Sequence, residues 1–275
     1  MKTASAGLAC LALATSAGQA IAQPLELPPD LPWPASFVVR INDRTVAAHA
    51  ETTARQPASL AKLAGAIVVL EAAERAPEGL ASAVRVSAWA AGALPVRLGL
   101  RAADTVRVRD LLAASVIGSA NDACRALAEH VAGTEQAFVA AMNRLAVRLG
   151  MRDTYFAEPC GFDRPEQRTT ALDLLRLADA ALALPELARL AGTTAHGFET
   201  LDGKRSFVIR NGNALLGMHP NVIGLKTGYT RGAGPSAIVV AREGLHTITV
   251  VVLQAEQRWP VTTVLLDWAL ERAQR

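Results

Sequence analysis

Aromatic side chains and concentrated positive charge are both scarce in this sequence. Phe, Trp and Tyr make up 4% of its 275 residues, and the formal net charge is only +3. Proteins that bind nucleic acid usually carry a Lys/Arg-rich block or a motif of stacking aromatics, and neither is present. A nucleic-acid partner is therefore not expected.

Metal-ligand patterns and long apolar runs are also lacking. The sequence has no His-Glu-x-x-His motif and no cysteine pair at zinc spacing, so we expect neither a metal nor another cofactor. No segment after residue 22 approaches the roughly 18 consecutive apolar residues of a transmembrane helix. The mature chain is therefore expected to have no transmembrane anchor.

The N-terminus carries the pattern of an export signal. Lys2 precedes an Ala-rich run that is too short to span a bilayer comfortably, and the Ala-Ile-Ala that ends at Ala22 fits a small-x-small cleavage site. Residues 1–22 are predicted to be a signal peptide, which leaves Gln23 as the mature start. The mature protein is expected to be soluble in the periplasm or a similar extracytoplasmic compartment.

Cysteine is rare, with three residues in the whole chain, and Cys10 lies in the predicted signal peptide. In an exported protein the remaining two, Cys124 and Cys160, could form a disulfide. Two free, buried thiols are the alternative, and the sequence leaves both open.

The rest of the chain is predicted to be one domain after a short leader. Residues 23–35 hold five prolines and are expected to be extended, with no core of their own. Strand patterns at both ends of residues 36–275 enclose a helical region, so the fold class is α+β: one antiparallel sheet flanked by helices, with a helical lobe inserted. Residues 151–170 are predicted to form a long ordered loop of the kind that borders a site. Strands are predicted at 36–41, 44–51, 105–108, 206–211, 222–230, 236–243 and 246–253, and helices at 58–73, 108–117, 122–132, 135–149, 171–184 and 259–274.

A lysine in an apolar helix is the first indication of chemistry. In "RQPASLAKLAGAIVVLEAA", Lys62 lies in a run that is apolar on every face until Glu71, and an unpaired buried ammonium is costly. Ser59 lies three residues earlier, on the same face. A free hydroxyl is a weak nucleophile, and a lysine whose pKa is lowered by burial, by the helix N-terminus and by a second cation could activate it.

Two further short motifs follow in order, Ser119-Ala-Asn121 and Lys226-Thr227-Gly228. Each is weak alone, because Ser119 could equally be a helix N-cap and Lys-Thr-Gly could be a strand end before a turn. Together with the Ser-x-x-Lys motif they are much more specific, since the first two motifs fall at predicted helix starts and the third on a predicted strand.

The motifs and the segments around them resemble the penicillin-recognising serine acyltransferases, in particular the low-molecular-mass D-alanyl-D-alanine carboxypeptidases. The likeness includes "VRVRDLLAASVIGSANDACRALAEHVAG", "NGNALLGMHPNVIGLKTGYT" and most of the chain after Ser36. It implies a β-lactamase/transpeptidase-like fold and removal of the terminal D-Ala from peptidoglycan stem pentapeptides through an acyl-enzyme on Ser59. It also implies covalent inhibition by β-lactams.

The resemblance assigns roles to individual residues. Lys62 is the expected base for Ser59, and Ser119 is the expected proton relay to the leaving amine. The expected substrate-binding set is Asn121 for an amide, Lys226 and Thr227 for the carboxylate, Gly228 beside them, and Tyr229, whose N–H would form an oxyanion hole with that of Ser59.

Other functions within the same family stay open. A D,D-endopeptidase that cuts peptidoglycan cross-links uses the same machinery, and Gly212 stands where some relatives have a carboxylate-binding arginine. Many carboxypeptidases carry a second β-rich domain and a C-terminal anchor, but neither is expected here because the chain ends directly after the core fold. A class A β-lactamase needs a glutamate in a Glu-x-x-Leu-Asn setting, and Glu158 lacks the Leu-Asn. A catalytically silent penicillin-binding protein is the least supported alternative, since every motif residue is present.

Overall fold

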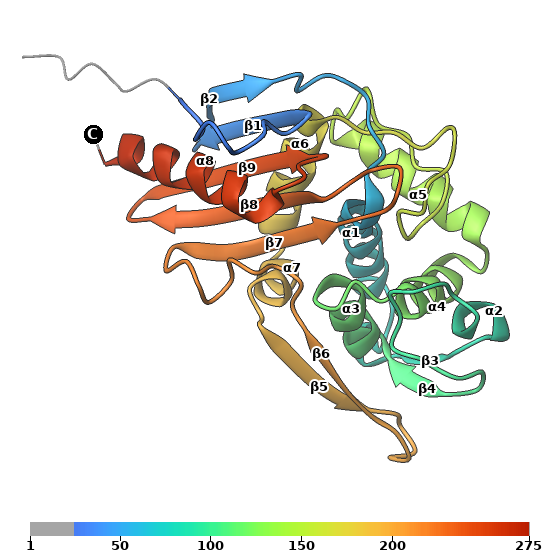
Figure 1. Ribbon diagram of the computed structural model, residues 1–275. Coiled ribbons are helices and arrows are strands. Elements are labelled where there is room, and N and C mark those ends of the chain that lie inside the picture. The colour runs from blue at the N-terminus through green and yellow to red at the C-terminus, as the bar shows by residue number, and fades with distance from the viewer. Residues whose placement is uncertain (1–24, 275) are drawn as a thin grey trace, which may run out of the picture.

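Strands from both ends of the chain form one antiparallel sheet, as expected. The computed structural model describes residues 25–274, so the predicted signal peptide lies outside the described residues. The sheet has the order β2-β1-β9-β8-β7, and β1 pairs with β9 along its whole length (Figure 1). Its strands are β1 (Ser36–Ile41), β2 (Arg44–His49), β7 (Val222–Gly228), β8 (Ser236–Glu243) and β9 (His246–Leu253).

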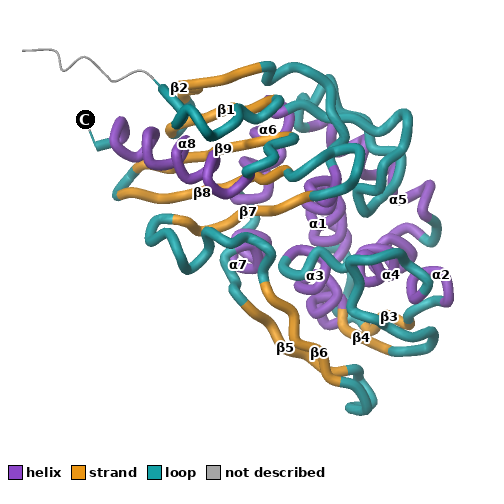
Figure 2. Tube along the Cα trace, in the orientation of Figure 1, coloured by secondary structure: helices purple, strands orange, loops and turns teal. Residues whose placement is uncertain are grey.

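A helical lobe is inserted between β2 and β7, with α1 near its centre (Figure 2). Helix α1 is buried on every face over its first ten residues and packs against α3, α4, α5 and α6. None of the helices in residues 25–274 is long and apolar enough to cross a membrane. The inserted elements are α1 (Ala61–Ala73), β3 (Ala83–Arg85), α2 (Ala88–Ala91), β4 (Thr105–Arg107), α3 (Val108–Val116), α4 (Asn121–Ala132), α5 (Glu135–Arg148), α6 (Ala171–Leu182) and α7 (Pro185–Ala191).

Different helices cover the two faces of the sheet. Side chains alternate along a strand, so Phe37 and Val39 point to α8 (Arg258–Ala273), while Val38 between them joins the core around α1. Figure 1 shows α8 in front of the sheet and α6 behind it. Because both faces are covered, the central strands β8 and β9 are nearly continuous apolar runs.

The structure contains four short elements that the sequence did not predict, β3, α2, α7 and a strand β5, and it excludes one alternative role of a motif residue. Strand β6 (Ser206–Arg210) pairs with β5 (Ala195–Glu199), which the sequence did not indicate, and the two form a hairpin that projects from the body (Figure 1). The β5 sequence has a glycine at its centre and no β-branched residue, so its strand propensity is weak. The alternative role of Ser119 as a helix N-cap is wrong, because Ala120 holds that position and α4 begins without a side-chain cap.

The proline-rich segment before β1 packs against the α8 side of the sheet. Leu31 is buried there, and Leu25 and Leu27 contact the same apolar cluster. The Trp33 ring stacks on Phe37 with 5.5 Å between ring centroids. Residues 25–35 therefore use the core of the main domain.

Candidate active site

Ser59 lies in a tight turn that leads directly into α1. This 3-10 turn spans Ala58–Leu60, and Ala58 has a left-handed backbone (φ 48°) that non-glycine residues rarely adopt. Neighbouring segments press on the turn. A Cβ on Gly161 would lie 1.8 Å from the Ala58 carbonyl oxygen, and a Cβ on Gly228 would lie 3.1 Å from the Ala58 Cβ. The nucleophile candidate is therefore held where the loop after α5 meets the end of β7.

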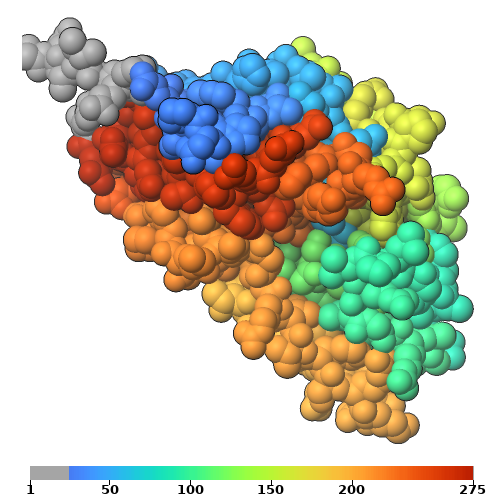
Figure 3. Space-filling model, viewed as in Figure 1, coloured from blue at the N-terminus to red at the C-terminus, as the bar shows by residue number. Residues whose placement is uncertain are grey.

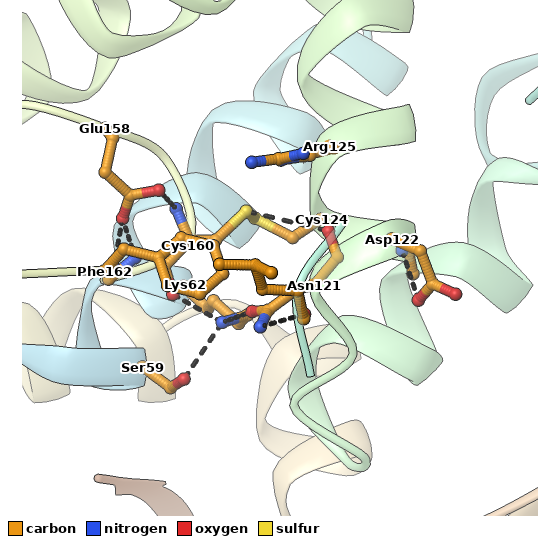
Figure 4. The surroundings of a disulfide bond; sticks show 12 residues. Ser59, Lys62, Asn121, Asp122, Cys124, Arg125, Glu158, Cys160 and Phe162 are labelled. Carbon is orange, nitrogen blue, oxygen red and sulfur yellow. Dashed lines mark hydrogen bonds between the residues drawn. A yellow bond between two sulfur atoms is a disulfide. The ribbon is translucent and has the colours of Figure 1, made fainter. Parts of the chain in front are cut away.

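Lys62 lies beside Ser59, as the motif spacing predicted. The residue is 1% exposed, and its Nζ is 2.9 Å from Ser59 Oγ. Nζ also donates hydrogen bonds to Asn121 Oδ1, at 2.8 Å, and to the backbone carbonyl of Cys160 (Figure 4). Three segments that are far apart in the sequence thus supply the polar partners of one amine.

Burial is the main influence on the pKa of Lys62. Desolvation lowers this pKa from 10.5 to about 7, and the carboxylate of Glu158 opposes the shift. A neutral amine has two N–H groups and one lone pair. Asn121 and Cys160 can accept the two N–H groups, which leaves the lone pair for the Ser59 hydroxyl. The geometry therefore suits an unprotonated Lys62 that takes a proton from Ser59.

A second serine and lysine form a separate hydrogen-bonded pair. Lys226 Nζ donates to Ser119 Oγ and to the backbone carbonyl of Thr227, both at 3.0 Å. Ser119 has a left-handed backbone (φ 57°) between α3 and α4, and such strain is typical of functional positions. Lys226 is 3% exposed, and burial, with the charges of Lys62 and Arg258, lowers its pKa well below 10.5. The charge of Lys62 therefore acts on Lys226.

Asn121 connects the Ser59–Lys62 pair to the segment that contains Leu94. It is the first residue of α4, and its Nδ2 donates to the carbonyl of Leu94 at 3.0 Å while its Oδ1 accepts from Lys62. These two bonds fix the orientation of the amide. An amide NH₂ group has two donors, so Nδ2 can still serve a second acceptor.

The remaining predicted residues, Thr227, Gly228 and Tyr229, lie at the C-terminal end of β7. Thr227 is half-buried, whereas Tyr229 is 67% exposed. A Cβ on Gly212 would lie 3.1 Å from Thr227 Oγ1, so the segment after β6 borders this hydroxyl. In the space-filling view the green helical lobe and the orange sheet lobe meet along a seam, and a few blue atoms from the region of α1 are visible within it (Figure 3). The candidate site lies where the two lobes meet.

Glu158 has a structural position that the sequence did not indicate. Its carboxylate is buried and accepts the backbone N–H of Cys160, at 3.1 Å, and those of Gly161 and Phe162. Burial raises the pKa of Glu158, while these N–H groups and the charge of Lys62 oppose the shift. The sequence shows Glu158 only as an acidic residue in a predicted loop. It does not show that backbone N–H groups of the same loop bind the carboxylate.

Arg258 is a second residue that sequence reasoning missed. It begins α8, and its Nη1 donates to the carbonyls of Gly228, at 3.0 Å, and Ser236, at 3.1 Å. These bonds tie α8 to the end of β7 and the start of β8. The sequence shows Arg258 only as one of many arginines, because the packing of the last helix on β7 is a tertiary feature.

Cys124 and Cys160 form a disulfide, so the alternative of two free thiols is wrong. Their Cα atoms are 6.0 Å apart, and both residues are buried. The bond joins α4 to the loop after α5, directly beside Lys62 and Asn121 (Figure 4).

Comparison with known sequences identifies the family. A family model described as D-alanyl-D-alanine carboxypeptidase matches residues 37–257. The D-alanyl-D-alanine carboxypeptidase DacD of Escherichia coli (strain K12) is 36% identical over 211 residues, which cover 74% of this chain and 53% of that protein. A D-alanyl-D-alanine endopeptidase of Pseudomonas aeruginosa is 32% identical over 200 residues, which cover 72% and 63%. The chain spans about half the length of several curated carboxypeptidases that it matches.

Solved structures agree with this assignment. A crystal structure of a D-alanyl-D-alanine carboxypeptidase from Mycobacterium tuberculosis H37Rv has a TM-score of 0.81 and 28% identity, covering 92% of this chain and 95% of that one. The match extends over both the sheet and the helical lobe, so the expected β-lactamase/transpeptidase-like fold is confirmed. The chain belongs to the D-alanyl-D-alanine carboxypeptidase family, peptidase family S11.

Proposed function

We propose that the protein is a serine D-alanyl-D-alanine carboxypeptidase that removes the terminal D-Ala from peptidoglycan stem pentapeptides. The hydrogen-bond set of Lys62 carries this proposal. A buried amine whose N–H groups are engaged by Asn121 and Cys160 presents its lone pair to Ser59. Family membership supplies the substrate class. The protein acts outside the cytoplasm, in the periplasm or an equivalent compartment, after removal of residues 1–22.

In the acylation step, neutral Lys62 accepts the proton of Ser59 Oγ as this oxygen attacks the carbonyl carbon between the last two D-Ala residues. The backbone N–H groups of Ser59 and Tyr229 stabilise the oxyanion that develops. The C–N bond then breaks, and Lys62 gives up the proton it took from Ser59, which reaches the leaving amine through Ser119, the hydrogen-bond partner of Lys226. Lys62 is then neutral again. This step yields free D-Ala and an ester on Ser59.

Hydrolysis of the ester completes the turnover. Lys62 accepts a proton from water as the water oxygen attacks the ester carbonyl, and Ser59 leaves with a proton returned to its Oγ. Glu158 does not suit the role of a separate base, because its carboxylate accepts the N–H groups of Cys160, Gly161 and Phe162. This arrangement disfavours a class A β-lactamase mechanism, in which a free glutamate activates the water.

Lys226, Thr227 and Arg258 form the candidate site for the carboxylate of the substrate. The charges of Lys226 and Arg258 repel each other, which lowers the pKa of Lys226 beyond the effect of burial. An anion bound between them would offset this repulsion and form charge-assisted hydrogen bonds. Gly212 has no side chain to crowd the Thr227 hydroxyl, and Asn121 has a second donor for a substrate amide.

A D,D-endopeptidase is the second candidate. The P. aeruginosa relative named above is an endopeptidase, and 63% of its length is covered, more than that of DacD. The same acylation chemistry would apply, with a cross-linked strand as the leaving amine. The difference would lie in whether the site requires a free terminal carboxylate.

Mass spectrometry of muropeptides would test both candidates. Residues 23–275 would be incubated with a mixture of monomeric pentapeptide and cross-linked dimer, with Ser59→Ala as the matched control. We expect the pentapeptide to lose one alanine while the dimers survive. Splitting of the dimers would favour the endopeptidase, and an unchanged mixture, with no acyl adduct from penicillin, would overturn both proposals.

A further inference from the structure

The two acceptors that orient Lys62 come from separate backbone segments. Asn121 lies at the first position of α4, whereas the carbonyl of Cys160 belongs to the loop after α5. In the sequence 38 residues lie between Asn121 and Cys160, and neither acceptor belongs to α1, the helix that carries Lys62. The direction of the lone pair on Lys62 therefore depends on the relative position of α4 and this loop.

The disulfide joins these same two segments. Cys124 lies in α4, three residues after Asn121 and hence on the same helix face. Its partner is Cys160 itself, the residue whose carbonyl accepts from Lys62. The Cys160 sulfur is 3.8 Å from the carbonyl oxygen of Asn121 (Figure 4). A single covalent bond thus links the carriers of both acceptors.

Cys160 is anchored at three points. Its side chain is bonded to Cys124, its N–H donates to the buried carboxylate of Glu158, and its carbonyl accepts from Lys62. The next residue, Gly161, lies against the Ala58 carbonyl so closely that a Cβ would not fit. A shift of the loop after α5 would therefore move the Cys160 carbonyl that accepts from Lys62. It would also displace Gly161 against the turn that carries Ser59.

We infer that the Cys124–Cys160 disulfide is a positioning element for acylation: it holds the Cys160 carbonyl against Lys62 and makes the acylation rate depend on the oxidation state of this pair. The inference rests on the proposed role of Lys62 as the base. Reduction by a dithiol breaks the S–S bond and gives two thiols, with two electrons and two protons from the dithiol, which is oxidised to its own disulfide. In the reduced protein the loop keeps the Glu158 bonds but loses its covalent tie to α4.

The test is the kinetics of acylation by a fluorescent penicillin, with the maximal rate and the half-saturating concentration measured separately. The oxidised wild type would be compared with Cys124→Ala/Cys160→Ala and with dithiol-reduced wild type. Leu266→Ala is the matched control, because it weakens the core on the α8 face of the sheet without contact with the site. Thermal melts would confirm that each sample is folded at the assay temperature.

We expect the maximal acylation rate of the double variant to fall by about 10- to 100-fold, the cost of a displacement of about 1 Å in a reacting geometry. The half-saturating concentration should stay unchanged, since β7 is untouched. Leu266→Ala should acylate at the wild-type rate although its melting temperature falls. Reoxidation of the reduced wild type should restore the rate, which a merely damaged fold would not do.

Two results would overturn the inference. One is a double variant that acylates as fast as the oxidised wild type. The other, which applies even if the double variant does not fold, is a wild type with both thiols free that keeps its full rate. Failure of the proposed function is distinct, because the oxidised wild type itself would then form no adduct on Ser59.

Discussion

The two buried lysines of the site differ in their surroundings, although each is hydrogen-bonded to a serine. Lys62 has partners from the turn before α1, from α4 and from the loop after α5, and the acid Glu158 opposes the lowering of its pKa. Lys226 has Ser119 and the carbonyl of its own neighbour, and its charged neighbours are both cations. The surroundings of Lys62 fix the direction of its lone pair. The surroundings of Lys226 bring several positive charges together. We therefore propose proton transfer for Lys62 and anion binding for Lys226.

The largest effect is expected from Lys62→Met. Methionine keeps an unbranched, flexible side chain but cannot accept a proton, so the maximal acylation rate should fall by about 10²- to 10⁴-fold. Stopped-flow acylation by a fluorescent penicillin measures this rate, with Ser59→Ala as the blank. A variant that acylates like the wild type would assign the base to another group.

Ser119→Ala should have the next largest effect. It removes the relay to the leaving amine and one acceptor of Lys226, so release of D-Ala from a pentapeptide should slow by about 100-fold. The half-saturating pentapeptide concentration should change little, because Lys226 and Thr227 remain. If that concentration rises while the maximal rate holds, Ser119 binds substrate rather than transferring a proton.

Arg258→Gln tests the cationic region directly. Loss of a charge-assisted hydrogen bond to the substrate carboxylate should raise the half-saturating pentapeptide concentration about tenfold. The maximal rate of penicillin acylation should change less, since Lys62 is not in contact with Arg258. An unchanged half-saturating concentration would remove Arg258 from the carboxylate site.

Glu158→Gln should shift a pH profile rather than abolish activity. In the proposed mechanism acylation requires neutral Lys62, so the rate should rise with pH through the pKa of about 7. The carboxylate of Glu158 is the charge that raises this pKa, against the effect of burial. Glutamine removes the negative charge, so the pKa of Lys62 should fall and the rising limb should move to lower pH. A move to higher pH would mean that the loop has opened to water and that burial of Lys62 has been lost.

The Ser59–Lys62 pair could be predicted from the sequence because its spacing and local setting are visible in it. An apolar run predicts that Lys62 is buried, and i, i+3 spacing on a helix predicts that it lies beside Ser59. Strand patterns at both chain ends likewise predicted the single antiparallel sheet. The Ser59–Lys62 pair and each separate strand depend on residues that are close in the sequence.

What could not be predicted depends on distant residues. The carbonyl of Cys160 is a backbone atom that any residue type would supply, so its role in orienting Lys62 leaves no sequence signal. Glu158 and Arg258 act through backbone groups of loops and strand ends, which become neighbours only after packing. The disulfide was left open for the same reason: spacing alone does not show which segments meet.

The pKa of Lys62 is the most direct test of the account. The chain has only four lysines, Lys2, Lys62, Lys204 and Lys226, so lysine-selective ¹³C labelling gives few signals to assign by NMR. Lys62→Met identifies the signal, and the exposed Lys204 is the internal control. We predict that Lys62 titrates near pH 7. A Lys62 that stays protonated to pH 10 would contradict its role as the base for Ser59.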